Sequence, residues 1–287
     1  MLLVLFTSCV TTDPDDSGHQ KHGNQDSGGT VDSGDPADSG QSDDSGDSGA
    51  DEPPELAGEV QYEIQYTGTI NTDLGVELWD LDLFDTRDSV LTSIEGTFLL
   101  CYFSAGSWED WRDDAGEFPD SAIGKALDGW EGENWLDTRD VTVRSIMESR
   151  MDHAVERGCD GVDPDNVDGY TQKSGFDLTY EDQLDYNRFL AQSAHDRGLL
   201  VSLKNDLDQL EDLAADFDLA VNESCAEYRE CARLSVFTDD EKPVLHIEYV
   251  DNWSDAQSLA DEVCGIQPGL STLIKTWDLD EHRLACP

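Results

Sequence analysis

The chain has 287 residues, of which 65 are Asp or Glu and 17 are Lys or Arg, so its formal net charge is −48. This charge excludes a nucleic-acid binder, which needs basic surfaces to neutralise phosphates, and electrostatic docking onto an anionic membrane. The 7 Trp, 8 Tyr and 9 Phe residues also exclude a wholly disordered polyacid.

The acidity is divided between two parts of the chain. Residues 1–59 hold 14 acidic residues and one base, Lys21, so this segment carries a charge of −13. The rest of the chain therefore carries −35 of the total of −48. Most of the negative charge belongs to the part that is expected to fold, and it needs an explanation of its own.

Residues 1–9 are predicted to be an export signal. Met1 to Phe6 form a short apolar run, and the small residues Thr7 and Ser8 precede Cys9. This arrangement resembles a bacterial lipoprotein signal, in which the cysteine is lipidated, although the run is shorter than the usual ~7–15 residues and lacks a basic start. We expect a cell-surface or outer-membrane lipoprotein held only through Cys9, or otherwise a secreted protein. The alternative is a frayed N-terminus with an incidental cysteine.

Residues 10–58 are predicted to be a disordered acidic linker. They repeat Asp-Ser-Gly units such as DDSG and ADSG, and they contain no aromatic residue. Such a segment cannot bury enough apolar surface to offset its ordering entropy, and repulsion between its acids extends it. We therefore expect a single folded domain over residues 59–287, displayed on a flexible spacer.

Short apolar runs and amphipathic stretches alternate along this domain, a pattern that predicts a parallel sheet with covering helices. The expected strands are 60–66, 76–81, 98–103, 161–163, 199–203, 219–221, 244–249 and 272–274. The expected helices are 141–157, 179–197, 206–216 and 254–264. Eight strands in a domain of this length fit an α/β fold of the (β/α)₈ TIM-barrel type. A doubly wound open sheet is the alternative.

Polar side chains collect where the expected strands end. In a barrel of this type, the C-terminal ends of the strands carry the chemistry. The side chains selected there are Asp80, Trp108, Asp163, Asp165, Lys204, Asn205, Asn222, Glu223, Glu248 and Tyr249.

Carboxyl groups from neighbouring strands suggest glycoside hydrolysis, which needs one protonated and one ionised carboxyl group beside the bond that is cleaved. Aromatic side chains could stack on the sugar rings, and the candidates are Trp108, Trp111, Trp130, Trp135, Tyr170, Tyr249 and Trp277. Other chemistry has little support: the six His residues show no HExxH or similar spacing, so we expect no metal and no cofactor.

From about residue 60 to residue 248 the chain resembles glycoside hydrolase family 114, the endo-α-1,4-polygalactosaminidases. The matching stretches are CYFSAGSWEDWR (101–112), GWEGENWLDTR (129–139), RGCDGVDPDNVDGY (157–170), DQLDYNRFLAQSAHDRGL (182–199), SLKND (202–206), VNESCAEYREC (221–231) and VLHIEYV (244–250). The resemblance implies a (β/α)₈ barrel that hydrolyses an α-1,4-linked galactosamine exopolysaccharide.

The resemblance also implies roles for individual residues. Asp165 best matches the family's catalytic aspartate, as nucleophile, and Glu223 its catalytic glutamate, as general acid/base. Asp163 is the rival of Asp165, and Glu248 is the rival of Glu223. The residues expected to contact and position the sugar are Asp80, Asp163, Lys204, Asn205, Asn222, Glu248, Tyr249 and Trp108.

The cysteines also favour an exported protein. Once Cys9 is set aside as the lipid site, six remain, and six cysteines allow 15 pairings. Cys225–Cys231 is the favoured local bridge, Cys264–Cys286 could hold the C-terminus, and Cys101–Cys159 would join neighbouring strands. The alternative for the last pair is two buried, reduced thiols.

Two further functional interpretations stay open: a non-catalytic carbohydrate-binding barrel or adhesin, and a hydrolase of a different α-glycan. The protein is expected to be a monomer whose partner is its polysaccharide. The charge of −35 on the domain would attract a cationic amino-sugar polymer, and adaptation to a salty habitat would explain the same charge.

Overall fold

The structure is a computed structural model that describes residues 56–287. The predicted lipidation site Cys9, the signal segment 1–9 and nearly all of the predicted linker 10–58 lie outside these residues. Within them, every helix is too short or too polar to cross a membrane.

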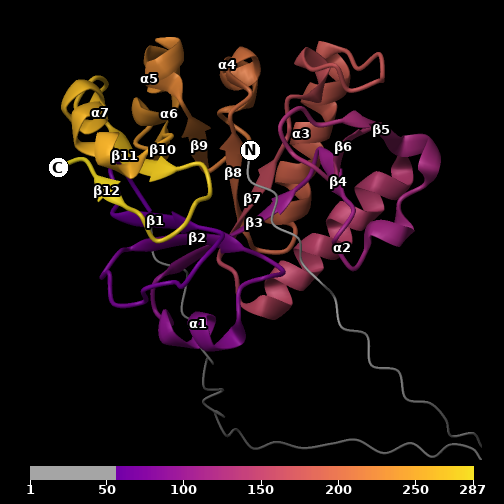
Figure 1. Ribbon diagram of the computed structural model, residues 1–287. Helices are drawn as coiled ribbons and strands as arrows, with labels where there is room; N and C mark the ends of the chain where they lie inside the picture. The colour runs from indigo at the N-terminus through magenta and orange to yellow at the C-terminus, as the bar shows by residue number, and fades with distance from the viewer. Residues whose placement is uncertain (1–55) are drawn as a thin grey trace, which may run out of the picture. The chain divides into compact units, whose positions relative to one another are not determined.

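Eight parallel strands form one curled sheet, and their order in the sheet follows their order in the chain (Figure 1). The strands are β1 (Tyr62–Gln65), β2 (Leu78–Asp82), β3 (Phe98–Ser104), β7 (Gly161–Asp165), β8 (Leu200–Lys204), β9 (Leu219–Glu223), β10 (Val244–Val250) and β11 (Leu270–Thr276). All eight overlap the strands predicted from the sequence. A doubly wound sheet would reverse its strand order at a switch point, so the barrel-type α/β fold is confirmed.

The strand β1 and Val60 just before it approach the last two parallel strands, β10 and β11, through side chains. The Val60 N–H group donates to Ser271 Oγ at 2.8 Å, and the Tyr62 hydroxyl donates to the His246 carbonyl at 2.8 Å. The short strand β12 (Leu284–Ala285) pairs antiparallel with β11, and Arg283 beside it donates to the Tyr62 carbonyl. Together, these contacts define the seam of the curled sheet.

One apolar cluster fills the inside of the sheet. It takes alternate residues from the strands on both sides of the seam: Val60, Tyr62, Ile64, Leu78, Phe98, Leu100, Leu219, Val221, Leu245, Ile247 and Leu273. A second cluster lies between the outer face of the sheet and the helices, and it contains Trp79, Leu81, Phe103, Val162, Val201 and Leu203. Because the strands are buried on both faces, several of them read as continuous apolar runs.

The two long helices begin and end where the sequence indicates. The helix α2 (Val141–Arg157) is capped by Asp140, which accepts from the Thr142 N–H group at 2.7 Å. The helix α3 (Tyr180–His195) has a capping box, in which Thr179 and Asp182 bond to each other's backbone N–H groups. Each helix buries one face against the sheet.

The other helices are short: α1 (Asp88–Ser93), α4 (Leu210–Leu213), α5 (Cys225–Tyr228), α6 (Ser235–Thr238) and α7 (Ala256–Val263). Single 3₁₀ turns occur at Ala115–Glu117, Asp120–Ala122, Gly169–Thr171, Leu207–Gln209, Cys231–Leu234 and Trp253–Asp255. The predicted helix 206–216 is wrong at its start, because Asn205 and Asp206 have φ angles of +51° and +43° and cannot be helical. The predicted helix 254–264 is shortened to α7 after a 3₁₀ turn.

A small antiparallel sheet is inserted between β3 and α2, and the sequence did not predict it. It consists of β4 (Ser107–Glu109), β5 (Ile123–Ala126) and β6 (Glu133–Leu136), in the order β4-β6-β5. It follows the C-terminal end of β3, so it stands beside the end of the barrel at which the predicted catalytic residues lie.

Candidate active site

The two predicted catalytic carboxyl groups lie at the C-terminal ends of β7 and β9, and both side chains are on the inward side of their strand. Along β7, Gly161, Asp163 and Asp165 alternate with Val162, which packs in the outer cluster. Along β9, Leu219 and Val221 belong to the inner cluster, so Glu223 shares their side of the strand. The strand β8 between them presents Lys204 in the same way. Three charged groups therefore converge on one opening.

Glu223 is held by two side chains. Its Oε1 accepts from the Tyr249 hydroxyl at 2.5 Å, and its Oε2 accepts from Asn205 Nδ2 at 3.0 Å. Asn205 Oδ1 also accepts from the Glu223 backbone N–H group at 2.9 Å. The left-handed backbone of Asn205 turns its amide toward the neighbouring strand. Asn205 thus fixes both the backbone and the carboxylate of Glu223.

Asp165 has fewer partners. Its Oδ1 accepts from the N–H group of the next residue, Asn166, at 2.7 Å. Asn166 has a φ angle of +61°, and its carbonyl oxygen lies only 1.6 Å from where a Cβ atom at position 106 would stand. Only glycine fits at position 106, and Gly106 allows the chain after Asp165 to turn close against the end of β3.

Lys204 is the buried cation at the centre of this group. Its Nζ pairs with Asp163 Oδ2 at 3.1 Å and lies 5.5 Å from the centre of the Tyr102 ring. The other oxygen of Asp163 accepts a short hydrogen bond from Ser202. Although burial lowers the pKa of Lys204, the carboxyl groups of Asp163 and its neighbours raise it well above its usual value. Lys204 is therefore charged at physiological pH.

The two candidate catalytic groups have opposite pKa shifts. Burial raises the pKa of Asp165 to about 6, against the attraction of Lys204. Burial also acts to raise the pKa of Glu223, but Lys204 and the hydrogen bonds from Tyr249 and Asn205 outweigh it, so the pKa falls below its usual value. A single proton on this pair therefore resides on Asp165.

Asp80 lies deeper in the barrel than this pair. It is fully buried on β2, and its Oδ1 accepts from the Tyr66 hydroxyl at 3.2 Å. Burial and the nearby charge of Asp163 raise the pKa of Asp80 well above its usual value. Burial and the charge of Asp163 therefore both favour the neutral form of Asp80.

A cavity of about 140 Å³ opens at this end of the barrel. Its lining residues are Tyr102, Leu127, Trp130, Glu133, Asp165, Asn166, Val167, Asp168, Lys204, Asn205 and Glu223. Four predicted site residues are among them: Asp165, Lys204, Asn205 and Glu223. Glu133, Asn166 and Asp168 are polar lining residues that the sequence analysis did not select. The stretches GWEGENWLDTR and DPDNVDG contained them, but only the fold brings them to the cavity.

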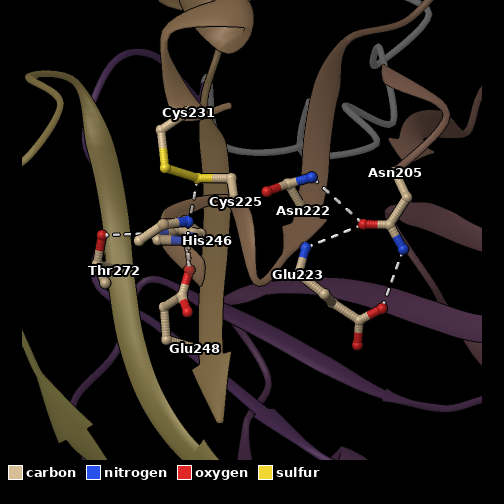
Figure 2. The surroundings of a disulfide bond; sticks show 9 residues. Asn205, Asn222, Glu223, Cys225, Cys231, His246, Glu248 and Thr272 are labelled. Atoms are coloured by element: carbon tan, nitrogen blue, oxygen red, sulfur yellow. Dashed lines mark hydrogen bonds and ion pairs between the residues drawn. A yellow bond between two sulfur atoms is a disulfide. The ribbon is translucent and has the colours of Figure 1, made fainter. Parts of the chain in front are cut away.

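The other six predicted site residues do not line this cavity. Asp163 and Tyr249 contact Lys204 and Glu223, which do line it, and Asp80 contacts Tyr66, whereas Asn222, Glu248 and Trp108 are turned to other partners. Asn222 and Glu248 alternate with inward-facing residues, and Figure 2 shows Glu223 and Glu248 in separate hydrogen-bonded groups. Glu248 Oε1 accepts from the Ala226 N–H group at 2.7 Å and lies 2.8 Å from His246 Nε2. Asn222 donates to Asn205, and Trp108 donates its indole N–H to the Ala115 carbonyl. Their contacts are with the protein.

Aromatic rings flank the carboxyl groups. The Tyr249 ring stacks on Trp277, with the ring centres 4.3 Å apart and the planes 16° apart. Trp277 keeps 52% of its surface exposed, and Trp130, which lines the cavity, keeps 56% exposed. Trp135 is buried instead. Two open indole surfaces therefore stand near the site, one on the inserted sheet and one after β11.

All six cysteines of the domain are paired, as Cys101–Cys159, Cys225–Cys231 and Cys264–Cys286. Cys225–Cys231 is the bridge that the sequence favoured, and the other two are pairings that it left possible; the alternative of reduced thiols at Cys101 and Cys159 is wrong. Three disulfides suit an oxidising compartment. Figure 2 shows the Cys225–Cys231 bridge beside His246. The sulfurs and His246 are close enough to resemble a metal site, but the disulfide consumes the thiolates that a metal would need.

Comparisons with known proteins identify the family of the chain. Residues 43–287 match the glycoside hydrolase family GH114. The crystal structure of Aspergillus fumigatus Ega3 in complex with galactosamine is similar at 38% identity, with a TM-score of 0.77, and covers 82% of this chain and 99% of that chain.

The glycoside hydrolase domain of PelA from Pseudomonas aeruginosa shares the fold at 14% identity, with a TM-score of 0.62, over 78% of this chain and 98% of that chain. A search of curated proteins finds no matching relative. The family match spans most of the chain, and the resemblance read from the motifs is confirmed: this chain belongs to glycoside hydrolase family GH114.

Proposed function

We propose that this protein hydrolyses an α-1,4-linked, galactosamine-containing exopolysaccharide, with Asp165 and Glu223 as the catalytic pair. The observation that carries the proposal is that these two carboxyl groups line one cavity with Lys204 between their strands, in a chain 38% identical to a protein crystallised with galactosamine. Asp163 is engaged by Lys204 and Ser202, and Glu248 by His246 and Ala226, so neither rival is free to react.

The chemistry divides into two steps. The ionised carboxylate of Asp165 attacks the anomeric carbon while the protonated carboxyl of Glu223 gives its proton to the leaving oxygen. Glu223 then takes a proton from water, which attacks the covalent intermediate and releases Asp165. One proton on the pair is sufficient throughout.

The location of that proton adds a requirement. In the protein alone it resides on Asp165, because Lys204, Tyr249 and Asn205 favour the charged form of Glu223. The proposed roles therefore need the proton to move to Glu223 when the substrate is bound. A sugar that touches Asp165 and its leaving oxygen beside Glu223 would favour this transfer.

Chemical rescue with azide tests the roles. In Asp165→Ala, azide would replace the missing nucleophile and attack an aryl α-glycoside from the opposite face, so we expect a β-glycosyl azide. In Glu223→Ala, azide would intercept the covalent intermediate and give the α-glycosyl azide. The reverse pattern of products would exchange the two roles.

We propose that Trp277 and Trp130 are stacking surfaces for sugar rings on either side of the catalytic pair. Trp277 stacks on Tyr249, whose hydroxyl contacts Glu223, and about half of the Trp277 surface, 52%, stays exposed. Aromatic faces of this kind suit the apolar face of a pyranose. A chain bound across both surfaces would be cleaved at an internal linkage.

A panel of polymers tests the substrate. We expect reducing ends to appear from an α-1,4-galactosamine polymer and not from a neutral α-1,4-glucan or galactan. Tight binding without any release of reducing ends would instead support the carbohydrate-binding or adhesin interpretation. Release from a neutral polymer at an equal rate would support a hydrolase of a different α-glycan.

We also propose that the enzyme is exported as a monomer and displayed through a lipid at Cys9. The three disulfides support an oxidising compartment. Metabolic labelling with a clickable fatty acid tests the anchor, since Cys9→Ala should lose the label and move the protein into the medium. Label retained in Cys9→Ala would remove the lipid from the proposal.

A further inference from the structure

Glu133 is a buried carboxyl group in the cavity, and the proposed catalytic steps of Asp165 and Glu223 give it no role. It begins β6 of the inserted sheet, is 6% exposed, and lines the same cavity as Asp165. One of its oxygens accepts a hydrogen bond from Ser107 Oγ at 2.6 Å. That is the one hydrogen bond that side chains within residues 56–287 supply to it. Its other oxygen is free to meet a molecule in the cavity.

A directed chain of hydrogen bonds holds Glu133 in place. Asn166 Nδ2 donates to Ser104 Oγ at 3.0 Å, and the two hydroxyls of Ser104 and Ser107 lie 2.6 Å apart. Because the Ser107 hydroxyl donates to Glu133, the hydrogen between the two serines must come from Ser104. The chain thus starts on Asn166, the residue after Asp165, and ends on Glu133, so it holds the Glu133 carboxyl group in a defined position.

Among residues 56–287, no basic side chain forms an ion pair with Glu133. The nearby guanidinium of Arg112 is occupied by Asp82 and Glu109, at 2.7 Å and 2.9 Å. Burial, with repulsion from Glu109 and Asp165, raises the pKa of Glu133 to about 7 despite the Ser107 bond. A cation in the cavity would lower this pKa and leave Glu133 ionised.

The charges of the residues that line the cavity determine where a cation would bind. Lys204 lines one part of the wall and repels a second positive charge, while Glu133 and Asp168 also line it and form no ion pair within residues 56–287. Asp168 already accepts hydrogen bonds from Thr171 and Gln172. A sugar bearing an ammonium group would therefore place it toward Glu133. An N-acetyl group at that position would bring a larger, neutral amide and leave a buried carboxylate without a counter-charge.

We propose that Glu133 binds the ammonium group of a galactosamine unit and makes the enzyme prefer the free amine to the N-acetylated sugar. The inference rests on the proposed function, since it assumes an amino-sugar substrate, and it adds the residue that selects the acetylation state. Glu133 pairs with the substrate's amino group and takes no part in bond cleavage.

The test compares Glu133→Gln with Glu131→Gln, an exposed acid two residues earlier in the same hairpin. Gln keeps the size of Glu and an acceptor for Ser107, so thermal unfolding should stay unchanged. We expect the ratio of kcat/KM for a galactosamine polymer to kcat/KM for its N-acetylated form to fall at least tenfold in Glu133→Gln. The ratio should be unchanged in Glu131→Gln.

An equal loss on both polymers would overturn the proposal, because Glu133 would then only support the fold of the site. An unchanged ratio would overturn it as well. A binding arm separates this proposal from the proposed function. In the Glu223→Gln background, calorimetry should show galactosamine binding that is lost when Glu133→Gln is added and unaffected when Glu131→Gln is added. If wild type cleaves neither polymer, the proposed function is wrong, but the binding measurement still tests whether Glu133 binds galactosamine.

Discussion

Two buried lysines, Lys204 and Lys275, lie at the ends of strands in the same barrel, yet their surroundings differ. Lys275 Nζ pairs with Glu63 and donates to the Asp280 carbonyl at 2.8 Å, and Arg283 approaches the other oxygen of Glu63 at 2.8 Å. Burial lowers the pKa of Lys275. We call Glu63, Lys275 and Arg283 the seam cluster. In this cluster each charged group pairs with a group of opposite charge from the same cluster.

Lys204 has an excess of acids around it. Asp163, Asp165 and Glu223 share one cation, and the last two open onto a cavity. The difference teaches that a buried ion pair at a strand end does not by itself mark an active site. An active site keeps charge that the protein does not neutralise and leaves it facing a space that a ligand can enter.

Breaking the seam cluster should affect stability and leave the chemistry intact. Lys275→Met removes one member of a buried pair, for which the loss is about 3–5 kcal/mol. We expect the low end of that range, because Arg283 still faces Glu63. Chemical denaturation measures the loss, and kcat per folded molecule should match wild type. Lys173→Met, at an exposed lysine, is the control and should change neither quantity.

The pH dependence should reveal the shared proton of the catalytic pair. Activity needs one proton on the two carboxyl groups, and in the free enzyme Asp165 holds it with a pKa of about 6. As the pH rises through about 6 that proton is lost, so kcat/KM should fall about tenfold for each further pH unit. A steady-state pH profile tests this; a flat profile from pH 6 to 9 would refute the shared proton.

The stacking surface of Trp277 should contribute more to substrate binding than to the cleavage step. Aromatic contacts are worth roughly 0.5–1.5 kcal/mol, so Trp277→Ala should raise KM for a long polymer roughly two- to twelvefold. Trp277→Phe keeps a stacking surface and should recover most of the loss. A fall in kcat with unchanged KM would mean that Trp277 acts by holding Tyr249 and Glu223.

Salt should have the smallest effect, and its sign is informative. If the acidic domain attracts a cationic polymer, kcat/KM should fall a few-fold as salt rises, because charges are screened over about 10 Å at 0.1 M. Kinetics in NaCl and in matched sucrose separate screening from viscosity. Activity and unfolding temperature that both rise with salt would favour adaptation to a salty habitat.

The sequence alone predicted the eight strands, because each is a short run rich in apolar residues, several of them continuously apolar, with a polar residue at or near its end. It did not show which face of a strand points inward, since both faces of a parallel sheet are buried and apolar. Adjacent polar residues such as Asn222 and Glu223 were therefore selected together, and only the alternation seen in the structure separates them.

The inserted sheet was not foreseen, for a different physical reason. Its strands are three or four residues long and show no regular alternation of apolar and polar residues. Their pairing depends on close contacts such as that of Gly124 with the Ser174 carbonyl, 50 residues away. Glu133 therefore reached the cavity through tertiary structure, which a pattern of local spacing does not encode.

The most direct test of the catalytic pair is the release of reducing ends from a galactosamine polymer by wild type, Asp165→Asn and Glu223→Gln, measured with their thermal unfolding. We expect each variant to lose roughly 10³-fold or more in kcat, while the unfolding temperature stays close to that of wild type. Near-normal turnover by either stable variant would contradict the assignment of Asp165 and Glu223 as the residues that cleave the glycosidic bond.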